Sequence, residues 1–196
     1  MDKLKELEAL YKEIVRNDFK SDSPIVFGEG KRNPYIMLIG EAPGQKEEEL
    51  GKPFVGAAGK NLDEFLRILE IKREDIYITN VVKIRPYKIN PSTGRKSNRT
   101  PTKAEIKSSL GVLLGQIQEI NPTIVVTLGN TPLRAIEGHN DVKIGDMHGK
   151  PVIKERYTLF PLYHPASIIY NRKLYDTYIE DLHILKKLLN RKKMEE

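Results

Sequence analysis

Several polar residues that could act on a bound molecule stand at the ends of apolar runs of strand length. Glu41 follows "YIMLIG", Asn80 closes "DIYITN", His164 follows "TLFPLY", and "LGNTP" follows the run "TIVVT". A carboxylate can stabilise positive charge, an amide can pair with the polar edge of a ligand, and an imidazole N–H can donate to developing negative charge. Because open parallel sheets bind ligands at the carboxyl ends of their strands, these groups are candidates for one site.

The loop from Gly40 to Gly59, "GEAPGQKEEELGKPFVGAAG", holds five of the chain's fourteen glycines. Glycine-rich loops after strands usually bind phosphate, and they normally carry a lysine and few acids. This loop carries four glutamates, so its charge is wrong for phosphate. Neither G-x-G-x-x-G nor G-x-x-x-x-G-K-[ST] occurs in the chain, which argues against a nucleotide-binding enzyme of the doubly wound type.

The elements that must position these residues alternate between strand and helix patterns. Apolar runs of strand length occur in "SPIVFG", "YIMLIG", "DIYITNVV", "TIVVTLG" and "YTLFPLY". Helical patterns cover residues 1–17, 58–71, 100–120, 130–138 and 174–193. We expect Thr100 or Thr102 to cap the third of these helices, and Asn130 or Thr131 to cap the fourth. The alternation predicts an α/β fold whose parallel sheet is covered on both faces, in a single domain over residues 1–196.

Basic charge is concentrated in one segment of the chain. The net charge is +6, and the stretch from Lys83 to Lys107 contains eight lysines and arginines against one acid. That stretch includes "PYKINPSTGRKSNRTPT", whose composition predicts a surface loop suited to a polyanion. A solvated loop without a partner is an equally good interpretation of the composition.

The complete absence of cysteine excludes several kinds of site. The chain can form no disulfide, no thiolate-bound zinc site and no iron–sulfur cluster held by thiolates. The first 17 residues read as a charged amphipathic helix and not as a signal peptide, and no apolar run approaches the length of a membrane span. We therefore expect a soluble, cytoplasmic protein without a membrane partner.

Six motifs, in a fixed order, give the chain a specific resemblance. They are "VFGEG", "GEAPG…E…GKPFVGAAGK", "YITNVVK", "NRTPT", "PTIVVTLGNT" and "FPLYHPAS". Together they resemble the family 4 uracil-DNA glycosylases. The resemblance implies a three-layer α/β/α sandwich with a central, mostly parallel sheet of about four strands. It also implies a DNA repair enzyme that flips deoxyuridine out of uracil-containing DNA and hydrolyses its N-glycosidic bond. A non-catalytic uracil- or DNA-binding module of the same fold is the alternative.

The resemblance also assigns roles at the site. Glu41 is expected to position water and stabilise the sugar cation, and His164 to donate to uracil O2. Phe54 is expected to stack on the base, and Asn80 to read its N3 and O4 edge. Three residues with little or no side chain let the backbone approach the substrate: Gly40, Ala42 and Gly44. Glu41, Phe54 and Asn80 also have plain structural interpretations, as a solvated glutamate, a core phenylalanine and a turn-forming asparagine.

DNA contacts are expected around this site. Apolar residues on a short loop could fill the gap that a flipped base leaves, and Ile168 with Ile169 meets that requirement, although core packing explains them equally well. Glu47 is a weak second catalytic candidate in a glutamate run that we expect to be mostly solvated. His148 reads as a surface residue near DNA, and no histidine spacing suggests a metal site. The candidates for phosphate contact are Lys60, Lys83, Arg85, Arg95, Lys96, Arg99, Ser167 and Arg172.

The chain departs from the family pattern in two respects. Family 4 enzymes typically hold a 4Fe–4S cluster through four cysteines, but Ile84 and Ser109 occupy two of those positions, and "YKEIVRNDFKSDSP" covers the others. We therefore expect no cluster, and packing around Ile84 must replace it. In addition, some relatives with a long basic loop trap uracil through a loop histidine, where this chain has Asn98. An amide is a poor nucleophile, so we expect ordinary turnover. We also expect the protein to be a monomer.

Overall fold

The computed structural model describes residues 2–170 and 173–195. Within them, a six-stranded sheet has the order β1-β3-β2-β6-β8-β7. The four inner strands are parallel, and the short outer strands β1 and β7 pair antiparallel with β3 and β8. A separate hairpin consists of β4 and β5. The strands are β1 (Glu29–Gly30), β2 (Ile36–Gly40), β3 (Tyr77–Asn80), β4 (Tyr87–Ile89), β5 (Lys96–Asn98), β6 (Ile124–Leu128), β7 (Val152–Ile153) and β8 (Thr158–Leu162).

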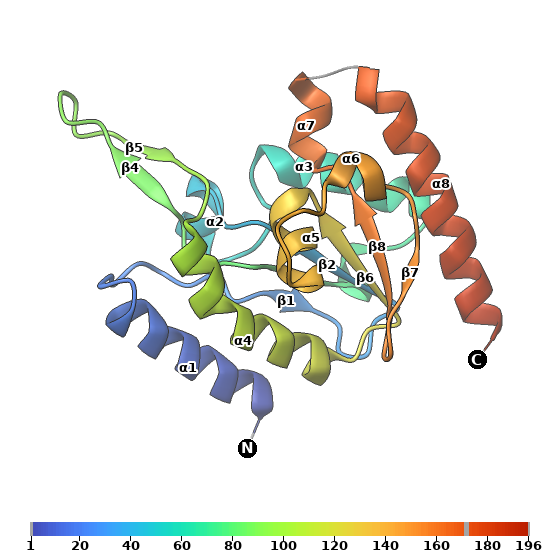
Figure 1. The fold of residues 1–196 in the computed structure, drawn as a ribbon, viewed down its shortest axis with the longest axis horizontal. Helices are drawn as coiled ribbons and strands as arrows, with labels where there is room; N and C mark the ends of the chain where they lie inside the picture. Colours follow the sequence, from blue (N-terminus) through green and yellow to red (C-terminus); the bar gives the residue numbers. More distant parts are fainter. Residues whose placement is uncertain (1, 171–172, 196) are drawn as a thin grey trace.

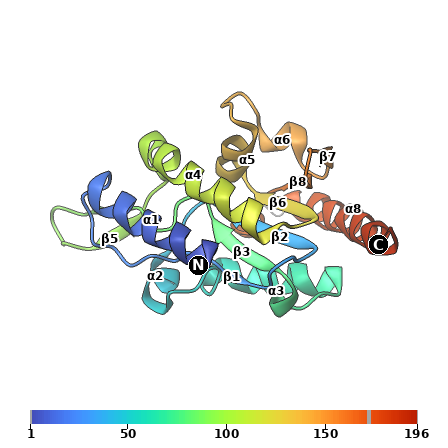
Figure 2. The same ribbon diagram turned by 90° about the horizontal axis from the view of Figure 1, so that it is seen from below.

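Helices cover both faces of this sheet, so the fold is the expected three-layer α/β/α sandwich (Figures 1 and 2). On one face, Leu38 shares a core with Phe65 of α3 and Leu185 of α8. On the other face, Ile39 shares a core with Leu113 of α4 and with side chains of α1 and α5. The helices are α1 (Lys3–Asn17), α2 (Gln45–Leu50), α3 (Ala57–Leu69), the 3-10 turn η1 (Arg73–Asp75), α4 (Lys103–Ile120), α5 (Asn130–Glu137), α6 (Ile144–Met147), α7 (Pro165–Tyr170) and α8 (Lys173–Met194).

The parallel strands form where the apolar runs are continuous. Every residue of β2, β3, β6 and β8 is buried, as expected for strands with helices on both sides. The register pairs Gly40 with Asn80 and Leu128 with Leu162, so the four strands end at one edge. The residues that follow these strands therefore lie next to one another along that edge.

Two local expectations are wrong. The run "SPIVFG" forms no strand; Val26 is buried and its N–H donates to the carbonyl of Lys83, while Gly28 at φ +130° breaks regular strand geometry. The short β1 follows instead. Neither Asn130 nor Thr131 caps α5, because both lie inside the helix and Gly129 is its N-terminal cap. The cap of α4 is Thr102, whose hydroxyl accepts from the N–H of Glu105 at 3.2 Å. The Glu105 carboxylate in turn accepts from the backbone N–H of Thr102 at 2.7 Å.

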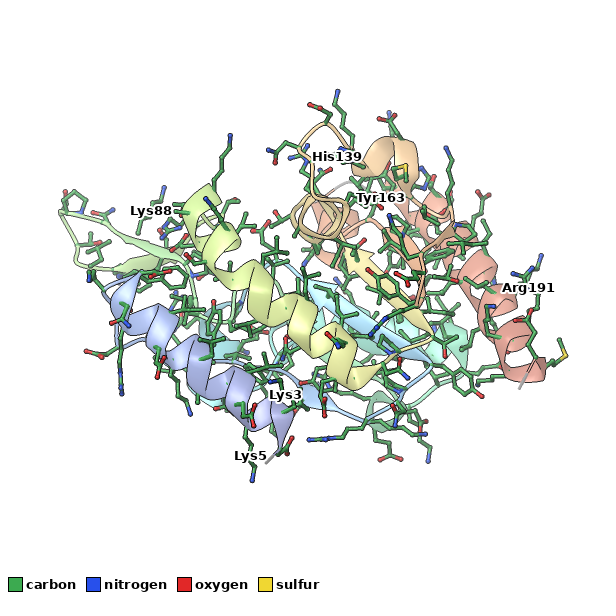
Figure 3. All side chains as sticks on the ribbon, turned by 60° about the horizontal axis from the view of Figure 1, so that its bottom comes forward. Lys3, Lys5, Lys88, His139, Tyr163 and Arg191 are labelled. Carbon is green, nitrogen blue, oxygen red and sulfur yellow. The ribbon has the colours of Figure 1, made fainter. Side chains whose placement is uncertain are left out.

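The β4–β5 hairpin extends away from the body of the molecule (Figure 1). Residues 88–98 are exposed throughout, and Lys88, like Lys3 and Lys5 on α1, lies on the outer surface (Figure 3). The expected basic surface loop is therefore a projecting hairpin. Among the described helices, none is both long and apolar enough to cross a membrane.

Candidate functional site

Two adjoining cavities lie along the edge where the parallel strands end. The first, which we call the Phe54 cavity, has a volume of about 410 Å³ and includes Phe54 and Asn80 in its wall. The second, the Glu41 groove, has a volume of about 390 Å³ and includes Glu41 and Thr131. His164 lines both cavities, so the fold brings together the polar groups that follow all four parallel strands.

Phe54 is held in an uncommon backbone conformation. Its φ is +52°, in the left-handed region, and its side chain is only 5% exposed. Arg73 donates to the carbonyl oxygens of Pro53 and Phe54 and so fixes the loop. The Phe54 ring lies beside the His164 ring, with centroids 6.2 Å apart and planes 28° apart. The ring therefore belongs to the hydrophobic core beneath the loop and also forms part of the cavity wall.

Glu47 stabilises the same loop. Of the glutamate run that we expected to be mostly solvated, Glu49 is exposed, Glu48 is partly buried and Glu47 is buried. Its carboxylate is buried and accepts hydrogen bonds from the backbone N–H groups of Gly44 at 3.1 Å, Val55 at 3.0 Å and Gly56 at 2.7 Å. A carboxylate that accepts several N–H groups satisfies donors that the glycine-rich turns would otherwise leave unpaired. It also explains two of the loop's glycines, because a Cβ on Gly44 or Gly56 would lie 2.8 or 3.0 Å from this carboxylate.

Asn80 points its amide across the end of β2. A Cβ at Gly40 would lie 2.3 Å from Asn80 Oδ1 and 2.7 Å from Phe54 Cζ, so only glycine permits this close approach. Asn80 is 2% exposed, and its amide has no hydrogen-bond partner within residues 2–170 and 173–195. Because buried amides normally have partners, this one is available to a ligand in the Phe54 cavity. The Lys83 ammonium nitrogen donates to the backbone carbonyl oxygen of Asn80 at 2.5 Å and so restrains this residue.

The protonation of His164 is set by its surroundings. Burial lowers the pKa of this imidazole, which favours the neutral form. The backbone N–H of Ala166 donates to Nδ1 at 3.1 Å, so Nδ1 is the acceptor and the remaining proton is on Nε2. His164 therefore offers a neutral N–H donor to the cavities.

Glu41 is half-buried, and one of its carboxylate oxygens accepts from the Thr131 hydroxyl at 2.5 Å. The other oxygen has no hydrogen-bond partner in the described part of the chain. Sequence reasoning missed Thr131 and considered it only as a helix cap. Its position in "LGNTP", directly after β6, was the signal, since the other three strand ends carry the remaining site residues.

Two of the expected phosphate contacts are wrong. Lys83 is fully buried, its ammonium nitrogen also donates to Thr79 Oγ1 at 3.1 Å, and desolvation lowers its pKa to about 7. Arg85 is 6% exposed; it forms an ion pair with Glu48 at 3.2 Å and donates from Nε to Asn98 Oδ1 at 2.8 Å. Both side chains belong to a segment, residues 81–86, that is buried throughout.

The other phosphate candidates have different environments. Arg99 is partly exposed, but its guanidinium forms two hydrogen bonds to Glu105, at 2.8 and 2.7 Å. Arg95 and Lys96 are exposed on the hairpin, Lys60 is exposed on α3, and Ser167 lines the Glu41 groove. These four remain predictions. Ile168 and Ile169 fall in α7, but their side chains lie outside the described part of the structure, as does Arg172 as a whole.

His148 is not a free surface residue. Its Nδ1 lies 2.8 Å from Asp181 Oδ2, and its ring packs against Tyr163 with centroids 4.7 Å apart. Burial raises the pKa of the Asp181 carboxyl, and the adjacent histidine opposes that shift. The pair links the end of α6 to α8, and a contact of His148 with DNA stays a prediction.

A hydrogen-bonded cluster connects the positions where the family cysteines are missing. Ser109 and Ile84 are buried, and the Tyr11 hydroxyl lies 2.9 Å from Ser109 Oγ. The same hydroxyl accepts from the backbone N–H of Lys83 at 2.9 Å. Packing around Ile84 was expected, but the hydrogen bonds through Tyr11 were not. In the residues that the structure describes, no group of three or more His, Asp or Glu side chains could hold a metal ion.

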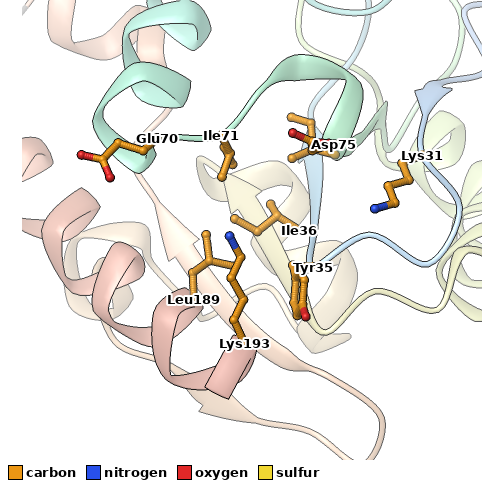
Figure 4. Close-up of a pocket in the computed structure, with 9 residues that line it drawn as sticks. Lys31, Tyr35, Ile36, Glu70, Ile71, Asp75, Leu189 and Lys193 are labelled. Carbon is orange, nitrogen blue, oxygen red and sulfur yellow. The ribbon is translucent and has the colours of Figure 1, made fainter. Parts of the chain in front are cut away.

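A third cavity lies at the opposite edge of the sheet. It has a volume of about 240 Å³ and is lined by Tyr35 and Ile36 at the start of β2, with Lys193 from α8 (Figure 4). Acidic and basic side chains are mixed in its wall, including Glu70 and Lys31. Because it contains none of the strand-end groups described above, it is separate from the candidate site.

Sequence comparison relates this chain to known proteins. The family model described as the uracil DNA glycosylase superfamily matches residues 27–186. A Type-4 uracil-DNA glycosylase of Thermotoga maritima is 38% identical over 170 residues, covering 85% of this chain and 84% of that protein. One of Archaeoglobus fulgidus is 35% identical over 180 residues, covering 88% and 86%. A DNA polymerase of Bacillus phage SP01 is 32% identical over 166 residues, which are 84% of this chain but 17% of the polymerase. The family match spans every strand-end residue of the site.

Proposed function

Because the chain belongs to the uracil DNA glycosylase superfamily, we propose that it flips deoxyuridine out of DNA and hydrolyses the bond between C1′ and uracil N1. Water supplies the new oxygen on C1′, uracil leaves, and an abasic site remains. The names and the coverage of the Type-4 relatives support this activity. The observation that carries it is the continuity of the Phe54 cavity and the Glu41 groove through His164.

Uracil recognition is assigned to the Phe54 cavity. The Phe54 ring supplies a stacking surface, and stacking of a base on an aromatic side chain contributes about 1–3 kcal/mol. The unpartnered Asn80 amide accepts from uracil N3–H and donates to O4. Cytosine presents the reverse pattern at these two atoms, so a fixed amide rejects it.

Bond cleavage is assigned to His164 and Glu41. Breaking the glycosidic bond places positive charge on the sugar and negative charge on the departing base. The neutral His164 Nε2–H donates to uracil O2 as that negative charge develops. The Glu41 carboxylate, oriented by Thr131, stabilises the sugar cation and uses its other oxygen to position water.

The proposed enzyme works as a monomer and without an iron–sulfur cluster. The chain contains no cysteine, and the Tyr11 hydrogen bonds connect the segments that a cluster would otherwise connect. The site residues come from the strand ends, and none of them depends on a metal ligand.

Uracil release from DNA tests the proposal directly. The protein is incubated with labelled oligonucleotides that carry a single uracil, thymine or cytosine, and abasic sites are then cleaved with alkali. We expect strand cleavage only at uracil. Tight binding to the uracil oligonucleotide without an abasic product would instead indicate a non-catalytic binding module.

A further inference from the structure

Asn98 occupies the junction of the two cavities although it belongs to neither the sheet nor the glycine-rich loop. It is the last residue of β5 and lines both the Phe54 cavity and the Glu41 groove. The position is exposed, unlike that of Asn80. The hairpin therefore contributes a polar side chain to the site from outside the strand ends.

The orientation of the Asn98 amide is fixed from the protein side. Its Oδ1 accepts from Arg85 Nε at 2.8 Å, and the Arg85 guanidinium is buried and paired with Glu48. Since a guanidinium can only donate, the oxygen of the amide must face Arg85 and the nitrogen must face away. Asn98 Nδ2 has no partner within residues 2–170 and 173–195, and a Cβ on Gly44 would lie 3.4 Å from it. A neutral donor is thus presented at the rim that both cavities share.

The chemistry of the substrate limits which acceptors the Asn98 Nδ2–H group can bind. If uracil occupies the Phe54 cavity, its deoxyribose and the flanking phosphates pass the shared rim. The ring oxygen of the sugar loses electron density as the bond breaks, so it is a poor acceptor at that moment. A phosphate oxygen is a strong acceptor throughout. Arg99, a cation that lines the groove, already uses its guanidinium on Glu105.

We propose that Asn98 donates its Nδ2–H to a phosphate oxygen next to the flipped nucleotide, and that the Glu48–Arg85 pair holds the amide in place for this contact. The inference rests on the proposed function for the identity of the ligand. It assigns a substrate contact to the hairpin itself, in addition to the charges at its tip.

The test compares Asn98→Ala, Asn98→Asp and the control Ser97→Ala, an exposed neighbour on the same strand. Binding is measured with uracil DNA made uncleavable by fluorine at the sugar 2′ position. We expect Asn98→Ala to weaken binding about 10- to 100-fold, as is typical for a lost hydrogen bond to a charged group. Asn98→Asp should weaken it further through repulsion of the phosphate, and Ser97→Ala should have no effect. Thermal unfolding confirms that all three variants are folded.

A neutral methylphosphonate at the linkage 5′ or 3′ to the deoxyuridine identifies the acceptor. At one of the two linkages, it should weaken wild-type binding while leaving Asn98→Ala almost unchanged. Unchanged binding by Asn98→Ala, or an equal loss with every DNA, would overturn the proposal. Wild-type protein that binds this DNA but releases no uracil from cleavable DNA would refute the proposed function alone, because the Asn98 contact is judged by binding.

Discussion

The edge where the parallel strands end and the β4–β5 hairpin both carry residues suited to DNA, but they hold them differently. At the strand ends, backbone groups and neighbouring side chains fix each functional group, as Ala166 does for His164 and Thr131 for Glu41. At the hairpin, the charges are exposed, and Lys96 contacts little besides the Tyr87 ring, 4.1 Å from its centroid. Fixed groups can act selectively on a transition state, whereas exposed charges attract a polyanion. The difference suggests that the first region sets the rate and the second sets the affinity.

The start of the basic segment shows that charge alone does not place a residue in either region. Lys83 and Arg85 are of the same residue types as Lys96 and Arg95, yet they are buried. The Lys83 side chain donates to the carbonyl oxygen of Asn80, and Arg85 donates to the side-chain oxygen of Asn98. The two basic residues that follow β3 within a buried segment therefore hold residues of the site in place. Arg95 and Lys96, farther along the chain, are exposed on the hairpin.

The largest expected effects come from the strand-end groups. His164→Ala removes one preorganised donor, which typically costs about 10²–10³ in rate, and Glu41→Ala should cost a similar factor. In the proposed mechanism both groups act mainly in the transition state, so binding to the uncleavable uracil DNA should change little. Single-turnover excision at saturating enzyme measures the rate. Near-wild-type rates for both variants would break the proposed division between the two regions.

A pH-dependent effect on stability should distinguish Lys83 from the hairpin cations. Its pKa is about 7 in the folded protein, against an ordinary value of 10.5. Between these two values the unfolded chain binds a proton that the folded protein does not, so the free energy of unfolding rises with pH. Below pH 7 both states are protonated, and the cost of the buried charge is constant. The slope in the window from pH 7 to 10 is at most about 1.4 kcal/mol per pH unit.

Lys83→Met has no such proton to lose. Relative to this variant, wild-type protein should become more stable as the pH rises from 7 toward 10, as measured by urea unfolding at each pH. Lys96→Met is the matched control, because its ammonium group is exposed and should give no difference in slope. Parallel curves for wild type and Lys83→Met would show that the buried amine does not titrate in this window.

The contrast between these lysines also shows what the sequence could predict. The continuous apolar runs predicted the parallel strands and placed Glu41, Asn80 and His164 at one edge, because that inference depends only on strand direction. The fate of Lys83 depends on how Val26 and Tyr11 cover the end of β3, and those contacts come from distant parts of the chain. Residue type could not reveal that Glu47 would gather three backbone N–H groups. Contacts from distant parts of the chain therefore decided the environment of Lys83, and contacts within one loop decided that of Glu47.

A smaller effect is expected at the hairpin tip. Arg95→Ala combined with Lys96→Ala should weaken DNA binding and flatten its dependence on salt, because each phosphate contact contributes about one unit to the slope of log K against log salt. Between 50 and 200 mM salt, loss of two contacts changes the salt effect by about tenfold. Excision at saturating enzyme should stay near wild type. An unchanged slope would mean that the hairpin tip does not contact DNA, and a large loss of rate would erase the distinction between the regions.

The smallest expected effect is that of removing metal. With no cysteine, the protein has no thiolate for a 4Fe–4S cluster, and Tyr11 links α1 to Ser109 on α4 and to the backbone of Lys83. Purified protein should show no absorbance band near 400 nm, and a chelator should change neither excision nor thermal unfolding. Tyr11→Phe provides the contrast, because it leaves the buried N–H of Lys83 without its acceptor and should lower the free energy of unfolding by about 1–3 kcal/mol. Activity that is lost with the chelator and restored by iron would show that a metal, and not this hydrogen-bonded link, holds the base of the hairpin beside the site.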